Sequence, residues 1–355
     1  MPPMSPLDAF CHAIPKVELH VHLLGAVRPA TFAEMARRQG AGYTPEEAED
    51  LTRRDARPRG VLHILRALEQ RILRGPGDLE RIAYEYGIEA ARQNIRHAEV
   101  FWNPTGTARD ASIPYAAGAD AILAGFAAAE REAGITALLI PSIDREATPA
   151  EAVEMVEWML AHRRDGIVGL GIDYRETDRP PELFWKAYRM AQRGGFRLTA
   201  HAGEFGCGWE NVETAVELLG VERIDHGYTV LDEPALAARC AGRGLVFTVV
   251  PTNSYYLRTL PPERWAQDHP IRRMPAAGLL IHPNTDDPPF HRIDPAGCWR
   301  MMVEEFGFAP AELRGFMLNG IAGAFLPEVA KSGLRTRFAA EFDALLARHL
   351  PEARP

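Results

Sequence analysis

Two histidines lie close together in the segment VELHVHLLG, residues 17–25. If this segment is a β-strand, His20 and His22 point to the same face, because side chains alternate along a strand. A single strand histidine is more often a hydrogen-bonded core residue than a metal ligand. The pair therefore suggests a metal site only if other ligand-type side chains lie near it.

Further ionisable side chains lie at the ends of three other apolar segments. TAHAGE ends in His201 and Glu204, RIDHGY contains His226, and NTDDPP contains Asp286 and Asp287. Taken alone, the first could be a turn, and the third could be a loop that caps a helix. Together with the histidine pair they indicate one site, provided that the fold brings the four segments together.

Eight short apolar or β-branched segments are expected to be strands, and helical segments separate most of them. The expected strands are residues 16–23, 97–104, 135–143, 166–174, 197–204, 223–228, 244–253 and 278–287. Residues 148–166 are typical of the helices, with a threonine cap and proline at the start and a glycine at the end. Alternating strands and helices predict an α/β fold with parallel βα units, and eight such units close a (β/α)8 TIM barrel.

The chain is expected to be one barrel domain over residues 1–355, because it contains no internal repeat, low-complexity tract or long linker. The insertion after the first strand, about residues 41–96, has a helical pattern and is expected to form part of a lid. Active sites of TIM barrels lie at the carboxyl ends of the strands. The ionisable side chains of the first, fifth, sixth and eighth strands should therefore meet at one opening.

Three histidines and one carboxylate form a nitrogen and oxygen donor set that suits Zn²⁺. The expected ligands are His20, His22, His201 and Asp286. Three more groups, Glu204, His226 and Asp287, then lie close to the metal without binding it. Proton transfer at a metal-bound water needs unliganded acids and bases of this kind.

Composition argues against several other classes of protein. The net charge is −8 without a basic patch, and no Lys/Arg-rich amphipathic helix is evident, so we expect neither a nucleic-acid partner nor a membrane surface. The start, MPPMSPLDAF, lacks the basic and apolar regions of a signal peptide. The four cysteines are widely scattered, as expected for reduced thiols in a cytoplasmic protein. Nothing in the sequence indicates an oligomeric state.

The motifs PKVELHVHLLG, HAGE, RIDHGY and NTDDP occur in this order, and the sequence in which they lie resembles the adenosine and adenine deaminases of the metal-dependent aminohydrolase superfamily. The likeness extends over about residues 15–325. It implies a (β/α)8 barrel with one zinc ion that removes the amino group of a 6-aminopurine by hydrolysis. Related enzymes with two metals carry a lysine on the fourth strand, and GIVGLGIDYR has none.

The resemblance also implies a role for each unliganded group. Asp287 and His226 are expected to orient the attacking water and take its proton, and His226 also to stabilise the developing alkoxide. Glu204 is expected to protonate ring nitrogen N1 as hydroxide adds to C6. Ammonia then leaves, and the product is a 6-oxopurine.

Two positions depart from the pattern of adenosine deaminases and bear on the substrate. Leu24 stands where those enzymes usually carry an acid that binds a ribose hydroxyl, and a leucine cannot accept that hydrogen bond. After the fourth strand, IDYRETDRPPELF is closer to the adenine-type branch, and Glu176 could accept a hydrogen bond from the N3/N9 edge of a free base. Packing for Leu24 and a helix N-terminal role for Glu176 are the structural alternatives.

The leading hypothesis is therefore a zinc aminohydrolase that prefers adenine, or a modified adenine or adenosine analogue, to plain adenosine. Adenosine deamination proper is the first alternative. A metal-dependent amide or ester hydrolase is the second, and a barrel used only for binding is the third. A binding barrel would be expected to have lost one of the seven ionisable groups, and all seven are present.

Overall fold

The structure is a computed structural model that describes residues 4–42 and 62–353. Its centre is an eight-stranded sheet in the order β1 to β8, with parallel pairing from β1–β2 through β7–β8. The strands are β1 (Lys16–His22), β2 (Ile95–Trp102), β3 (Thr136–Asp144), β4 (Gly169–Asp173), β5 (Arg197–Ala202), β6 (Arg223–His226), β7 (Val246–Val249) and β8 (Leu280–Pro283). Each of the eight predicted segments contains one of these strands or overlaps it.

The last strand closes onto the first through the segment that follows β8. Val21 and Asp286 form a parallel bridge. The amide of His22 donates to the carbonyl oxygen of Asp286 at 3.0 Å, and the amide of Asp286 donates to the carbonyl oxygen of His20 at 2.9 Å. The fold is thus a (β/α)8 barrel, as predicted. Its closure places the two histidines of β1 beside the aspartate pair.

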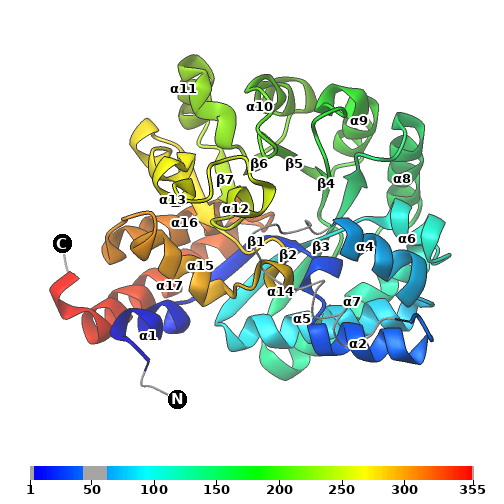
Figure 1. Cartoon of the computed structure of the whole chain (residues 1–355), viewed down its shortest axis with the longest axis horizontal. Helices are drawn as coiled ribbons and strands as arrows, with labels where there is room; N and C mark the ends of the chain where they lie inside the picture. Colours follow the sequence, from blue (N-terminus) through cyan, green and yellow to red (C-terminus); the bar gives the residue numbers. More distant parts are fainter. Residues whose placement is uncertain (1–3, 43–61, 354–355) are drawn as a thin grey trace.

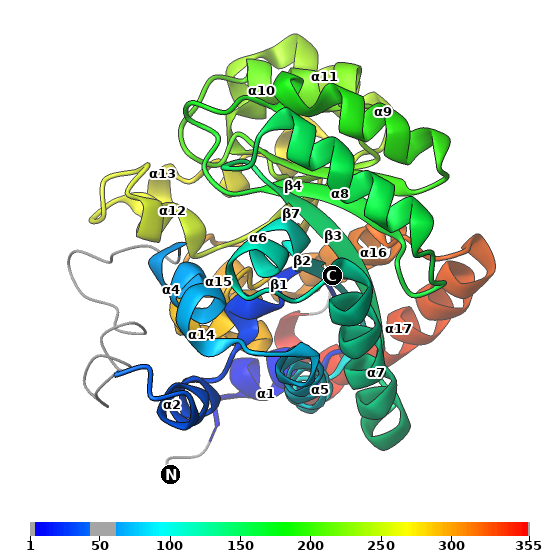
Figure 2. The same ribbon diagram turned by 90° about the vertical axis from the view of Figure 1, so that its right-hand side faces the viewer.

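Helices surround the sheet in both views (Figures 1 and 2). The main ones are α1 (Pro6–Ala13), α2 (Pro29–Arg38), α5 (Pro76–Arg92), α7 (Tyr115–Ala133), α8 (Pro149–Ala161), α9 (Trp185–Arg193), α11 (Pro234–Gly242), α15 (Pro295–Glu304), α16 (Leu313–Gly323) and α17 (Glu328–His349). Phe10 of α1 packs edge-on against Phe342 of α17, with ring centroids 5.2 Å apart. This contact joins the two ends of the chain on one side of the barrel.

Sequence signals explain where the helices begin. The predicted threonine cap of α8 is present: Thr148 and Glu151 form a reciprocal capping box. The predicted insertion after β1 is helical where it is described, with α4 (Leu62–Ala67), the π-helical turn η2 (Leu68–Ile72) and α5. Residues 43–61 of that insertion lie outside the described residues.

The strands are buried on both faces, as their continuous apolar sequences predict. All four cysteines are free thiols. No single helix of the described residues is long and apolar enough to cross a membrane. One bent pair, α6 (Pro104–Asp110) with α7, meets that test on length and composition alone.

Candidate active site and metal centre

The four predicted metal ligands lie together at the carboxyl end of the barrel. His22 Nε2 lies 3.2 Å from His201 Nε2 and 3.2 Å from Asp286 Oδ1, and His20 Nε2 lies 3.8 Å from the same Oδ1. Zinc–ligand bonds of about 2.0–2.1 Å in a tetrahedron place neighbouring ligand atoms about 3.3 Å apart. These separations therefore fit a zinc ion between the four side chains.

A buried nitrogen without a partner supports the same interpretation. His20 is fully buried, and its Nε2 has no hydrogen-bond partner within the described part of the chain. The ligand atoms of His20, His22 and Asp286 all lie within 4.8 Å of one another, and so do those of His20, His201 and His226. An unpaired nitrogen in a buried group of imidazoles and a carboxylate is what a metal site without its ion requires.

Nδ1 of each of the four imidazoles faces a polar group, at hydrogen-bonding distance for His20 and His226 and at a longer distance for His22 and His201. His20 Nδ1 lies 3.1 Å from the carbonyl oxygen of Thr248, and His226 Nδ1 lies 3.2 Å from the hydroxyl of Tyr228. His22 Nδ1 faces Asp173 Oδ2 at 3.4 Å, and His201 Nδ1 faces Asp225 Oδ2 at 3.4 Å. With Nδ1 directed to these partners, every Nε2 is left toward the shared centre.

The sequence analysis did not assign roles to those four partners. It also did not single out Asn253, whose Nδ2 donates to Glu204 Oε1 at 3.0 Å and lies 3.4 Å from Asp286 Oδ2. Asp225 and Tyr228 stand within the RIDHGY motif, so their positions beside His226 offered a signal. Thr248 and Asn253 offered none, because their relevance depends on which strand neighbours which.

The predicted acid Glu204 lies beside the predicted base His226, with Glu204 Oε2 3.5 Å from His226 Nε2. Burial, together with the charges of Asp286 and Glu176, raises the pKa of Glu204 well above its usual value. Burial and the neighbouring imidazoles of His20 and His201 lower the pKa of His226. The pair thus favours a protonated carboxyl group beside a neutral imidazole, an arrangement suited to proton transfer.

Asp287 occupies a narrow space against the first βα turn. Burial and the adjacent charge of Asp286 raise the pKa of Asp287 well above its usual value. A Cβ atom added to Gly25 would lie 1.6 Å from Asp287 Oδ1, so only glycine leaves room for this carboxyl group. Gly25 belongs to the 3₁₀ turn η1 (Leu24–Ala26), directly after β1.

Two of the seven residues adopt a backbone conformation that is rare outside glycine. His226 has φ +68° and Asp286 has φ +64°, both in the left-handed region. Each stands at or just beyond the end of its strand, where this conformation turns the side chain toward the barrel opening. Strained conformations of non-glycine residues concentrate at functional sites.

The carboxylate of Glu176 is fully engaged with the loop that carries Glu204. Its oxygens accept hydrogen bonds from the amides of Gly203, Glu204 and Phe205 at 2.7–3.0 Å, and from the side chain of Asn211 at 3.2 Å. Contact between Glu176 and a substrate stays a prediction. In the structure this residue fixes the backbone on which Glu204 stands.

Leu24 is the first residue of η1 and is 7% exposed, packed within the main hydrophobic cluster. Its neighbour Gly25 faces Asp287. Leu24 therefore lies at the edge of the site, although a contact with substrate stays a prediction.

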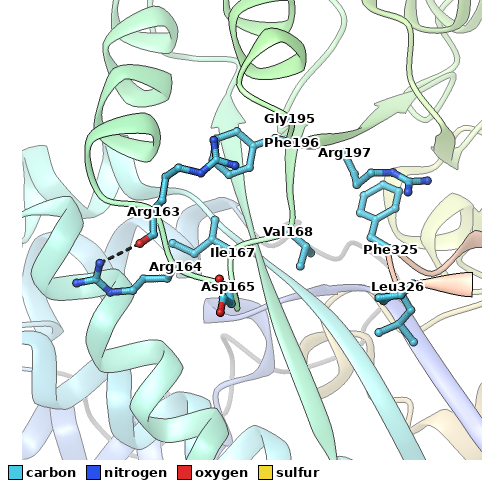
Figure 3. Close-up of a pocket in the computed structure, with 11 residues that line it drawn as sticks. Arg163, Arg164, Asp165, Ile167, Val168, Gly195, Phe196, Arg197, Phe325 and Leu326 are labelled. Atoms are coloured by element: carbon cyan, nitrogen blue, oxygen red, sulfur yellow. Dashed lines mark hydrogen bonds between the residues drawn. The ribbon is translucent and has the colours of Figure 1, made fainter. Parts of the chain in front are cut away.

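A separate hollow of about 420 Å³ lies at the opposite end of the barrel, where β4 and β5 begin (Figure 3). Its arginines already have partners: Arg163 donates to a backbone carbonyl, Arg164 to Asp120, and Arg197 pairs with Glu222. None of the seven predicted groups lines it. The seven predicted groups therefore lie away from this hollow, at the carboxyl end of the barrel.

Comparisons with known proteins agree with this arrangement. The sequence model of the adenosine deaminase family matches residues 15–341. The adenine deaminase of Rhodospirillum rubrum is 33% identical over 339 residues, which cover 94% of this chain and 98% of that protein. A Burkholderia ambifaria amidohydrolase solved with bound zinc is 57% identical, with a TM-score of 0.96 over 99% of this chain and 96% of that one. The adenine deaminase of Arthrobacter aurescens is 26% identical, with a TM-score of 0.84 over 94% and 99% of the two chains.

Replacing Gly25 with alanine tests whether the position of Asp287 matters. The added methyl group must displace the Asp287 carboxyl group, so we expect kcat with the native protein's substrate to fall by about 100-fold. Gly315→Ala is the matched control, because nothing lies within 4 Å of a Cβ atom at Gly315. Equal kcat values for the two variants, with similar unfolding temperatures, would contradict the assignment of Asp287 to the reaction.

Proposed function

This chain belongs to the adenosine deaminase family and is a metal-dependent hydrolase that deaminates purines. From that premise we propose that it uses one zinc ion to deaminate free adenine or a modified adenine in preference to adenosine. The observation that carries the proposal is the cluster formed by Nε2 of the three histidines and Oδ1 of Asp286, in which Nε2 of His20 has no hydrogen-bond partner among the described residues. Glu204 and Asp287 lie beside this cluster.

The proposed zinc ligands are His20, His22, His201 and Asp286. Zinc is favoured over other ions because the donor set combines imidazoles with a carboxylate. The zinc bound by the 57% identical Burkholderia ambifaria protein supports the same ion here. When bound, the metal lowers the pKa of a water ligand so that a nucleophile is available near neutral pH.

The remaining groups of the site move protons. His226, held neutral by burial, could take a proton at Nε2 from the attacking water, and Asp287 could orient that water through its buried carboxyl group. Glu204 is protonated because burial and nearby carboxylates raise its pKa, so it can donate a proton to ring nitrogen N1. A proton on N1 lowers the barrier to addition of the water oxygen at C6. The proton taken by His226 could then pass to the amino nitrogen, so that the C6–N6 bond breaks and ammonia leaves. Water and a 6-aminopurine thus give a 6-oxopurine and ammonia.

Leu24 supports a preference for a base over a nucleoside. An acid at this position could accept a hydrogen bond from a ribose hydroxyl, whereas leucine leaves that hydroxyl without a partner in a largely buried place. Sites that hydrogen-bond a polar substrate group can discriminate strongly against a mismatch. The relatives named adenine deaminase at 31–33% identity support the same preference.

We also propose that residues 1–355 form one catalytic domain. The segment after the last strand pairs with the first strand, and helices from both ends of the chain pack together. The helices α4 and α5 after β1 fit the predicted insertion, whose role as a lid remains part of this proposal.

The direct test is an ultraviolet deamination assay with the zinc-loaded protein. Adenine, adenosine, deoxyadenosine, AMP and N6-substituted adenines are compared at equal concentration. We expect the highest kcat/KM for adenine or an N6-substituted adenine. If adenosine is preferred, the substrate proposal is wrong, and if none of them reacts while zinc is bound, deamination of these purines is excluded.

Glu204→Gln tests the role of the acid. We expect zinc binding to be retained and kcat to fall by at least about 100-fold, because glutamine cannot donate the proton to N1. The exposed Glu305→Gln serves as the control and should keep native kinetics. A Glu204→Gln enzyme with near-native kcat would rule out this acid.

Leu24→Asp tests the origin of the substrate preference. The ratio of kcat/KM for adenosine to that for adenine should rise by at least about 10-fold, because the new carboxylate can accept from ribose. Leu24→Ala provides similar room without an acceptor and should leave the ratio near its native value. If both variants change the ratio equally, space rather than hydrogen bonding sets the preference.

A further inference from the structure

A buried ionic network lies inside the barrel beneath the histidines and takes no part in the proton transfers described above. Arg223 and Asp225 of β6 and Glu99 of β2 are each 0% exposed. Charges are buried in proteins only at a considerable desolvation cost, so each one needs a compensating interaction. Arg223 has its partner in Glu99, with Nη1 and Oε2 2.6 Å apart.

Asp225 finds its close partners elsewhere. The nearest atoms of Arg223 and Asp225 in their ion pair, Nε and Oδ1, are 3.7 Å apart, beyond hydrogen-bonding distance. Asp225 Oδ2 instead accepts from the hydroxyl of Thr199 at 2.7 Å, and Oδ1 accepts from the hydroxyl of Thr248 at 2.7 Å. Asp225 therefore forms its hydrogen bonds with the two neighbouring strands, and neutralisation of Arg223 alone does not explain them.

Strand register places Asp225 directly between two strands that serve the metal site. Asp225 of β6 is paired with His201 of β5 on one side and with Thr248 of β7 on the other. Its Oδ2 lies 3.4 Å from His201 Nδ1. Thr248 in turn presents its carbonyl oxygen and hydroxyl to His20 Nδ1 at 3.1 and 3.2 Å. The carboxylate of Asp225 thus contacts one proposed zinc ligand, His201, directly and a second, His20, through Thr248.

We propose that Asp225 is a positioning residue that holds His201 directly, and His20 through Thr248, with the proton on Nδ1 and the free electron pair of Nε2 toward the metal. A carboxylate facing Nδ1 accepts a hydrogen bond and cannot donate one, so it selects the Nδ1–H form of His201. The Thr248 hydroxyl donates its proton to Asp225 and can then only accept from His20. The carbonyl oxygen of Thr248, which also can only accept, selects the same form of His20, and the oriented hydroxyl reinforces that selection.

This inference rests on the proposed metal site, and zinc affinity tests it apart from catalysis. Apoprotein is titrated with Zn²⁺ in competition with a chromogenic chelator. Asp225→Asn should weaken zinc binding by about 10- to 100-fold, because an amide can turn its NH₂ group toward His201 Nδ1. Replacing Zn²⁺ with Co²⁺, whose visible absorption responds to ligand geometry, should give an altered spectrum in this variant.

Glu99→Gln is the matched control, because Glu99 is an equally buried carboxylate of the same network whose partners in the described part of the chain are His97, Arg223 and the amide of Phe325. The zinc dissociation constant of this variant should lie within about threefold of the native value even if its unfolding temperature falls. Equal weakening by Asp225→Asn and Glu99→Gln would show that general loosening of the core is the cause, and would overturn the inference.

Thr248→Val and Thr248→Ser keep the inference testable if Asp225→Asn does not fold. Valine removes the hydroxyl between Asp225 and His20 and should weaken zinc binding, whereas serine keeps the hydroxyl and should restore most of it. Equal affinities for valine and serine would contradict the link to His20. If the native protein itself binds no zinc, the proposed metal site fails, whereas native affinity in Asp225→Asn refutes only the role of Asp225.

Discussion

The structure of the site depends on one constraint: four imidazole rings share the end of the barrel, and each must turn the same nitrogen toward the others. Ring centroids of His20, His201 and His226 lie 4.4–5.0 Å apart. A cluster this close is compatible with one metal only if every Nδ1 has a partner outside it. The partners are Asp173 of β4 for His22, Asp225 of β6 for His201, Thr248 of β7 for His20, and Tyr228 in the turn after β6 for His226.

The closed barrel is what makes this arrangement possible. His20 and His22 come from β1, while Asp286 and Asp287 follow β8, more than 260 residues later in the chain. Backbone hydrogen bonds between Asp286 and the β1 histidines join the two segments directly. The left-handed conformation of Asp286 and the absence of a side chain at Gly25 then provide the space in which Asp287 lies. The site is therefore built around the closure of the sheet, where Asp286 adopts a backbone conformation that is rare outside glycine.

The eight strands and the seven converging groups could be predicted from the sequence, because apolar segments show where strands lie and the barrel rule states which ends carry chemistry. The hydrogen-bond and ion-pair partners of those groups could not be predicted. Whether Asp225 faces His201 depends on the register between β5 and β6, which a single sequence does not contain. Glu176 illustrates the same limit: its position after the fourth strand indicated proximity to the site, but its bonding to the amides of residues 203–205 depends on the path of another loop.

Asp286 and Asp287 show how the environment gives adjacent identical residues different roles. Burial opposes ionisation of both. For Asp286 the hydrogen bond to His22 and the charges of His20 and His22 outweigh burial and hold its pKa well below the usual value, as its proposed role as a metal ligand requires. For Asp287 the charge of Asp286 adds to burial and raises the pKa, which favours the protonated form of this carboxyl group. Paired groups whose pKa values are driven apart can bind and transfer protons at the same pH. The charge of Asp286 thus favours a proton on Asp287, and neutralising Asp286 would remove one cause of the raised pKa of Asp287.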